Sequence, residues 1–255
     1  MRALAAFSRF VGNTFALWVL VFACLAFLQP QWFIALKVAI VPLLGLVMFG
    51  MGLTLKLDDF AALARQPWRV ALGVVAHFVI MPGMAWLLCQ LFHLPAEIAV
   101  GVILVGCCPS GTASNVMVWL SKGDLALAVA IAAVTTLLAP LLTPALIWFL
   151  ASAWLPVSFM DMFWSILQLV MLPIVLGVLA QRLLGARVQV AVQVLPLVSV
   201  VSIVMIVCAV VAASQAKIAE SGLLIMAVVV LHNSFGYLLG YLTGKCCKLP
   251  LAQRK

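Results

Sequence analysis

The stretch Cys108-Pro109-Ser110-Gly111-Thr112-Ala113-Ser114-Asn115 follows an apolar run, 98–105, that is typical of a membrane helix. Proline has no backbone N–H donor, so it cannot continue the hydrogen-bond ladder of a helix. In a bilayer, free backbone groups are tolerated only where they are buried in protein or face a water-filled cavity. We therefore predict two half-helices separated near Pro109–Thr112, with the second beginning at about Ala113. Such breaks commonly bind an ion or a solute at mid-membrane.

The composition predicts an all-α polytopic membrane protein. Hydrophobic residues make up 67% of the 255 residues and charged residues only 8%, with a mean hydropathy of +1.33. These values exclude a soluble fold. Eight apolar windows are long enough to span a bilayer, and together they predict one transmembrane domain, 1–255. The windows are 12–28, 33–55, 68–91, 96–121 (the interrupted one), 124–150, 158–181, 190–212 and 222–244.

The basic charges predict how the chain is threaded through the membrane. The net charge is +8, which in a soluble protein would suggest binding to nucleic acid. If the N-terminus is cytoplasmic, twelve of the fourteen basic residues fall inside and only Lys37 and Lys217 fall outside. This asymmetry predicts cytoplasmic termini and contact with anionic membrane lipid, with no nucleic acid partner. The first apolar run has no small-x-small cleavage site, so we expect an uncleaved first span. The expected location is a bacterial inner (cell) membrane.

Two segments of the chain repeat at a fixed offset. The segment from Val74-Val75-Ala76-His77 to Leu94-Pro95 resembles Val229-Val230-Leu231-His232 to Leu249-Pro250, and every paired position differs by 155. Five spans separate the two copies, so the second copy is inverted, as in many secondary transporters. The sequence therefore predicts a first repeat of five spans, 1–155, and an incomplete inverted second repeat of three spans, 156–255.

Three segments carry a resemblance to a known family. They are Gly-Cys-Cys-Pro-Ser-Gly-Thr-Ala-Ser-Asn-Val-Met at 106–117, Gly-Asp-Leu-Ala-Leu at 123–127 and Ala-Pro-Leu-Leu-Thr-Pro at 139–144. They resemble the bile acid:sodium symporter family, close to bacterial homologues of the apical bile-acid transporter. The resemblance implies a ten-span secondary transporter with inverted repeats, of which this chain is similar to the first eight spans. Spans 1, 2, 6 and 7 would form a panel domain, and spans 3, 4, 5 and 8 a core domain.

The resemblance also implies a function and a set of site residues. The function would be sodium-coupled symport of a bile acid or a similar small organic anion, such as a pantoate-like acid. Ser114 and Asn115 match sodium ligands of the family, and Thr112 lies where its substrate meets the second half-helix. The family usually has hydroxyls where this chain has Ala128 and Ala132.

Two further departures concern the second sodium site. The family has glutamine where this chain has His77. Its second broken helix, which supplies a carboxylate ligand, would begin past Lys255. These departures predict weak sodium-dependent binding by the 255-residue chain, and the alternative is a truncated, non-transporting fragment or remnant of such a transporter.

Each candidate residue also has a purely structural interpretation. Ser114, Asn115 and Thr112 can cap a half-helix without binding a ligand. His77 either contacts substrate and carries a proton, or simply bonds a neighbouring carbonyl. His232 is expected to hold helices together. Ser110, Ser114 and His77 are the nucleophile-like set, but no Gly-x-Ser-x-Gly or His-Glu-x-x-His motif accompanies them, so we expect no enzyme.

Overall fold

The structure, a computed structural model, describes residues 14–54, 65–111, 114–184 and 188–254. Within these residues every regular element is helical, and each of the eight predicted spans contains a helix. Five helical segments are long and apolar enough to cross a membrane: Ile34–Thr54, Pro67–Leu91, Leu125–Ala151, Phe159–Leu184 and Gln215–Cys246. Shorter apolar helices cover Phe15–Leu28, Ala96–Cys107 and Leu197–Ala213. The predicted all-α polytopic class is confirmed.

The chain divides into two compact units. The panel unit contains α2 (Phe15–Leu28), the 3₁₀ segments η1 (Pro30–Trp32) and η2 (Ile34–Ala39), α3 (Ile40–Thr54), the π-helical turn η4 (Leu167–Met171), α10 (Leu172–Leu184) and α11 (Val188–Ala213). The core unit contains α5 (Pro67–Leu91), α6 (Ala96–Cys107), α7 (Ser114–Leu120), α8 (Leu125–Ala151), α9 (Phe159–Ile166) and α13 (Leu251–Arg254). Helix α12 (Gln215–Cys246) changes unit between Leu223 and Leu224. This grouping follows the predicted panel and core, except that α9 lies in the core unit.

Glycines set the closest helix contact of the panel unit, between α3 and α10. A methyl group added at Gly52 would collide with the carbonyl oxygen of Ile174, and one added at Gly177 with that of Phe49. Without side chains at these positions the two backbones approach directly, as is common between membrane helices. Beside this contact, a buried apolar cluster joins α2 to α11 through Ala26 and Val200.

The core unit packs α5, α6, α8 and α12 around one buried apolar cluster. Leu88, Ile103, Ile147 and Val228 each contribute a side chain that is almost fully buried. A methyl group at Gly236 would lie 2.7 Å from the sulfur of Met81, so α12 approaches α5 closely there. Gly236, Gly240 and Gly244 recur every four residues on α12, a spacing that predicts close packing at all three. However, no atom of the described residues lies within 4 Å of the Cβ position of Gly240.

The predicted break in the fourth span is confirmed, because α6 ends at Cys107 and α7 begins at Ser114. Cys108 takes an extended conformation with φ −69° and ψ 149°. A residue before proline avoids the helical region, because the proline ring would clash with its backbone. The helix therefore stops at the residue before Cys108. Thr112 and Ala113 lie outside the described residues.

The ends of α5 and α12 repeat the 155-residue offset in their backbone geometry. His93 and Lys248 both have positive φ, 49° and 55°. Leu94 N donates to Cys89 O, and Leu249 N donates to Gly244 O, so donors and acceptors both differ by 155. Each Leu-Pro pair thus follows the same kind of helix end. This supports the sequence repeat, while the inverted relation of the two copies stays a prediction.

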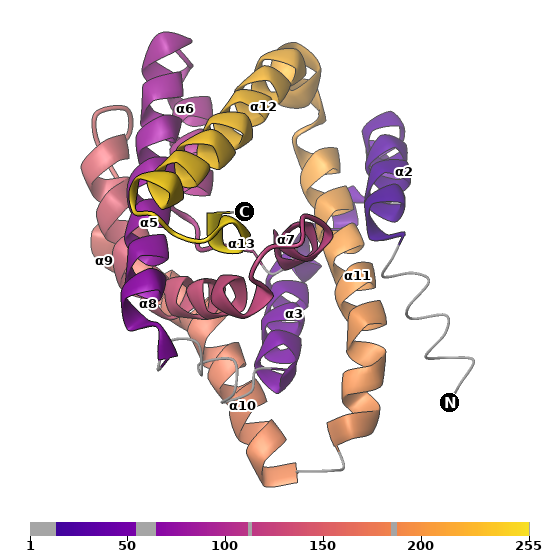
Figure 1. The fold of residues 1–255 in the computed structure, drawn as a ribbon. Helices are drawn as coiled ribbons and strands as arrows, with labels where there is room; N and C mark the ends of the chain where they lie inside the picture. Colours follow the sequence, from indigo (N-terminus) through magenta and orange to yellow (C-terminus); the bar gives the residue numbers. More distant parts are fainter. Residues whose placement is uncertain (1–13, 55–64, 112–113, 185–187, 255) are drawn as a thin grey trace. The chain divides into compact units, whose positions relative to one another are not determined.

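Polar contacts gather three chain segments at one end of the core unit. Nε2 of Gln253 donates to Oδ2 of Asp124 at 2.9 Å and to Oε1 of Gln66 at 3.1 Å. The backbone N of Asp124 donates to the carbonyl oxygen of Ala252 at 2.8 Å. Figure 1 shows α13 beside α5 and α8. Gln66 precedes span 3, Asp124 precedes span 5 and Gln253 follows span 8, so the predicted cytoplasmic ends of these three spans lie together.

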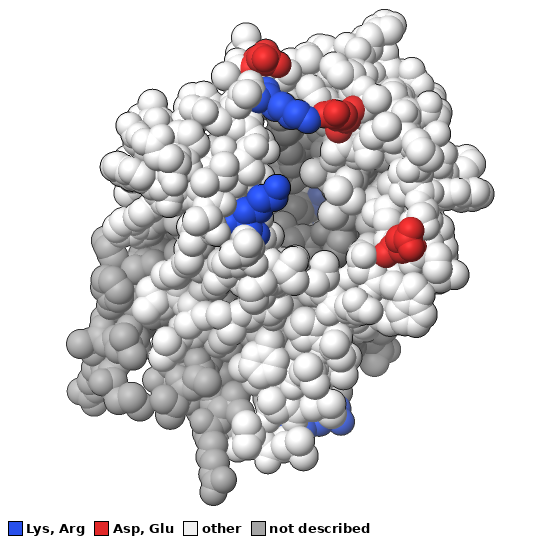
Figure 2. Space-filling view, turned by 180° about the vertical axis from the view of Figure 1, so that it is seen from behind, with Lys and Arg blue, Asp and Glu red and all other residues white. Residues whose placement is uncertain are grey.

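Most of the surface drawn in Figure 2 is uncharged, as a membrane protein requires.

Candidate functional site

The backbone groups freed by the break are bonded by side chains from α5 and α8. Thr143 Oγ1 donates to the carbonyl oxygen of Cys107 at 2.8 Å. His77 Nε2 lies 3.0 Å from the carbonyl oxygen of Cys108, and Ser110 N donates to Thr135 Oγ1 at 3.3 Å. These contacts replace bonds that a continuous helix would make within itself. The broken segment is therefore held by its neighbours.

Sequence reasoning did not single out Thr135 and Thr143. They are eight residues apart on α8, which is about 2.2 helical turns, so their side chains share one face. Both are almost fully buried, with 0% and 2% exposure. The available signal was the presence of three threonines, Thr135, Thr136 and Thr143, on an otherwise apolar span.

The first turn of α7 presents two side-chain oxygens close to the break. Ser114 Oγ donates to the carbonyl oxygen of Gly111 at 2.6 Å and lies 3.3 Å from Ser110 Oγ. Its lone pairs are left to accept a further partner. The side-chain oxygen of Asn115 is buried and has no hydrogen-bond partner among the described residues. A buried amide oxygen without a partner is costly, by roughly 1–3 kcal/mol on protein scales. This oxygen is a candidate ligand for a cation.

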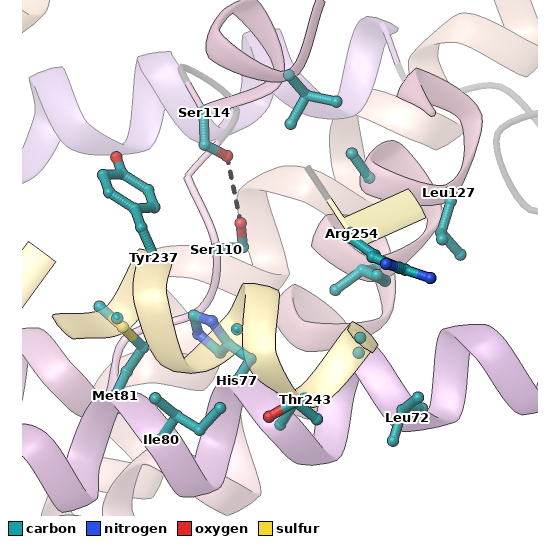
Figure 3. Close-up of a pocket in the computed structure, with 18 of the residues that line it drawn as sticks. Leu72, His77, Ile80, Met81, Ser110, Ser114, Leu127, Tyr237, Thr243 and Arg254 are labelled. Carbon is teal, nitrogen blue, oxygen red and sulfur yellow. Dashed lines mark hydrogen bonds between the residues drawn. The ribbon is translucent and has the colours of Figure 1, made fainter. Parts of the chain in front are cut away.

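A cavity of about 460 Å³ opens between the break, α5, α8 and α12. This volume is in the range of small-molecule sites. Figure 3 shows His77 from α5, Ser110 from the break, Ser114 from α7 and Tyr237 from α12 around it. Two predicted site residues, His77 and Ser114, thus line one cavity.

The charged side chains that line this cavity are Arg69, Asp124 and Arg254. Arg69 donates to Gln66 Oε1 at 2.7 Å. Arg254 donates from Nε to the carbonyl oxygen of Leu249 at 2.5 Å. Among the described residues, therefore, positive charge outweighs negative charge at the cavity. An anion is the favoured guest on electrostatic grounds.

The alanines noted in the sequence occupy two different environments. Ala128 lines the cavity, where it offers no oxygen ligand. Ala132 is buried, and its carbonyl oxygen accepts hydrogen bonds from Thr135 and Thr136. His232 donates to the carbonyl oxygen of Met81 at 2.9 Å. The expectation that His232 holds two helices together is confirmed.

Comparison with known proteins decides the family. Residues 41–221 match the model of the Sodium Bile acid symporter family. The chain belongs to this family. The expected resemblance is thus confirmed at family level, and the protein is an integral membrane protein of a transporter family.

The relatives are transporters as well. The chain is 52% identical over 248 residues to the uncharacterized sodium-dependent transporter YocS of Bacillus subtilis, covering 97% of this chain and 77% of YocS. It is 32% identical over 243 residues to the probable chloroplastic sodium/metabolite cotransporter BASS1 of Oryza sativa, covering 94% of this chain and 60% of that protein. It is 35% identical over 121 residues to the ileal sodium/bile acid cotransporter of Oryctolagus cuniculus, covering 48% of this chain and 35% of the rabbit protein. Family and relatives are not enzymes, as expected from the sequence.

The contacts of the nucleophile-like set agree with this assignment. His77 is bonded to the carbonyl oxygen of Cys108, and Ser114 donates to the carbonyl oxygen of Gly111. A nucleophile needs a general base within hydrogen-bond reach. His77 and Ser114 thus bond backbone carbonyls of the break, and Ser110 Oγ lies 3.3 Å from Ser114 Oγ.

Proposed function

We propose that this chain carries out secondary transport of a small organic anion coupled to sodium. The anion is a bile acid or a pantoate-like carboxylate. The family and the sodium-dependent relatives support transport in general. The excess of guanidinium groups over carboxylates at the cavity supports an anionic substrate.

The observation that carries the sodium assignment is the buried, unpartnered oxygen of Asn115. Na⁺ is a hard cation, and hard cations prefer oxygen donors such as amides and hydroxyls. Ser114 Oγ is the neighbouring donor on the same turn of α7. Ala128 and Ala132 add no side-chain oxygen, so the two donors alone leave the shell of the ion incomplete. We therefore expect sodium to bind weakly and to depend strongly on Asn115.

Uptake of radiolabelled taurocholate and pantoate into proteoliposomes tests this assignment. Asn115→Ala is expected to lower sodium-stimulated uptake at least about tenfold, equivalent to 1.4 kcal/mol of lost binding. The control is Gln31→Ala, which removes an exposed amide bonded to Gln29 in the panel unit. An unchanged sodium stimulation in Asn115→Ala would reject the sodium site. Absence of uptake of either anion by the parent protein would reject the substrate class.

We further propose that the protein lies in a bacterial cell membrane with the described C-terminal end cytoplasmic. The charge asymmetry and the gathering of Gln66, Asp124 and Gln253 at one end of the core unit support this orientation. Cys246 and Cys247 are exposed at the end of α12, so they report the side on which it ends.

A membrane-impermeant maleimide is expected to label these cysteines in inverted vesicles and to leave them unlabelled in intact cells. The Cys246→Ser/Cys247→Ser double variant identifies any signal from the other cysteines. Labelling of intact cells that disappears in the double variant would reverse the orientation.

A further inference from the structure

The hydrogen bond of His77 determines where this side chain takes up a second proton. A carbonyl oxygen only accepts, so Nε2 must carry its hydrogen to bond Cys108. The proton that charges the ring must therefore go to Nδ1. Within the described chain, no hydrogen bond reaches Nδ1. The ring is half-buried in the cavity wall and meets Phe78 edge-on, with ring centroids 5.3 Å apart.

Among the described residues, the charged groups around the cavity are positive on balance, because two guanidinium groups face one carboxylate. The titratable or charged residues that line it are Arg69 on α5, Cys108 at the break, Asp124 before α8, Tyr237 on α12 and Arg254 on α13. His232 on α12 is bonded to the carbonyl oxygen of Met81, one turn along α5 from His77.

Asp124 is the acidic member of this group, and its oxygens are already bonded. Oδ1 accepts from Leu127 N at 3.1 Å, where Asp124 caps α8, and Oδ2 accepts from Gln253 Nε2 at 2.9 Å. Two guanidinium groups share the cavity with it. A proton on His77 therefore increases the net positive charge at the cavity. The negative charge that balances it must come with a ligand.

We propose that His77 is a proton-binding site linked to anion binding, so that the cavity takes up one proton together with the organic anion. This inference rests on the proposed function and adds a coupling ion to it. A hydronium ion from the solvent gives its proton to Nδ1, so one O–H bond breaks, one N–H bond forms and a water molecule is left. An anion near Nδ1 stabilises the charged ring, and by reciprocity the charged ring tightens binding of the anion. Proton and anion then bind together, which is the thermodynamic requirement for symport.

The linkage predicts a pH dependence with a definite sign. Lowering the pH raises the fraction of protonated His77, so anion affinity rises as the pH falls. With one linked proton, the dissociation constant decreases by up to about tenfold per pH unit. The affinity is therefore measured between about pH 5 and 8, the range in which an ordinary histidine changes charge.

Calorimetric titration of the purified protein with taurocholate, at fixed sodium, measures this slope. Taurocholate carries a sulfonate that stays ionised at every pH used, so the ligand contributes no titration of its own. Parallel titrations in two buffers of different ionisation enthalpy count the protons taken up. We expect close to one proton for the parent protein.

Three variants assign the proton to a residue. His77→Gln retains an N–H donor for Cys108 O and is expected to abolish both the pH slope and the proton uptake. His232→Gln, which replaces a buried histidine bonded in the same way, should keep both. Asp124→Asn should also keep both if the proton is on His77.

Each outcome discriminates between the two proposals. Binding by the parent protein without a pH slope, or a slope that survives His77→Gln, overturns the proton site and leaves the anion site standing. Absence of taurocholate and pantoate binding at every pH overturns both. A slope that disappears in Asp124→Asn and persists in His77→Gln moves the proton to the carboxylate.

Discussion

Thr143→Val is expected to destabilise the core unit by about 2 kcal/mol and to abolish most anion uptake. The hydroxyl of Thr143 donates to the carbonyl oxygen of Cys107, and the side chain is 2% exposed. Valine keeps the shape of threonine but leaves this carbonyl without a donor. Removing one partner of a buried hydrogen bond costs about 1–3 kcal/mol, and a membrane interior supplies no water to replace it. Cys107 is the last residue of α6, so the carbonyl oxygen that loses its hydrogen bond lies at the break itself.

Thr136→Val is the matched control for this effect. Thr136 is also buried on α8, but its hydroxyl donates to Ala132 O of its own helix. Its removal frees no group of the break, so we expect little change in stability or uptake. Thermal unfolding followed by tryptophan fluorescence measures the first quantity, and proteoliposome uptake the second. Equal effects of the two variants would show that Thr143 does not hold the break.

Gly177→Val is expected to have the largest effect on folding in the panel unit. A Cβ atom at Gly177 would collide with the carbonyl oxygen of Phe49 and lie 2.9 Å from the Cα of Gly52. Both obstacles are backbone, which cannot move aside as a flexible side chain can. Overpacking commonly costs 1–3 kcal/mol, and we expect a loss of about 3 kcal/mol here. The fraction of monodisperse protein on size-exclusion chromatography and the unfolding temperature should both fall.

Gly45→Val on α3 provides the comparison. In the part of the chain that the structure describes, no atom lies within 4 Å of the Cβ position at Gly45, so valine there meets open space. Both variants replace a glycine of a membrane helix by valine. They differ in whether the backbone of a second helix lies against that glycine. A normal yield and unfolding temperature for Gly177→Val would mean that α3 and α10 do not pack through their glycines.

The sequence located the break in the fourth span because the break has a local cause. Pro109 lacks a donor and excludes Cys108 from the helical region, and neither effect depends on the rest of the chain. The apolar windows predicted the helices for a similar reason, since a lipid environment forces each span to satisfy its own backbone. His77 and Ser114 were recognised as polar residues on apolar spans, and both line one cavity.

The partners of the break could not be predicted in the same way. Thr143 bonds a residue 36 positions away, and His77 one 31 positions away, so these pairings depend on how three helices pack. Nothing in the sequence distinguishes Thr143 from Thr136, which lies about two helical turns earlier on α8. They differ in the acceptor that each hydroxyl meets, Cys107 O for Thr143 and Ala132 O for Thr136. Likewise, the assignment of Gly240 to packing was wrong because nothing in its four-residue spacing reports whether a second helix is present.

The sequence by itself thus determined the membrane class, the helical spans, the position of the break and the residues with unusual polarity. Each of these follows from local backbone chemistry or from transfer of apolar segments into lipid. Only the tertiary structure decided which side chains bond the broken backbone, that Asn115 keeps an unpartnered oxygen and that Asp124 is already bonded by Gln253. These features require residues distant in the chain to meet, and their meeting is set by close packing of helices rather than by any one segment.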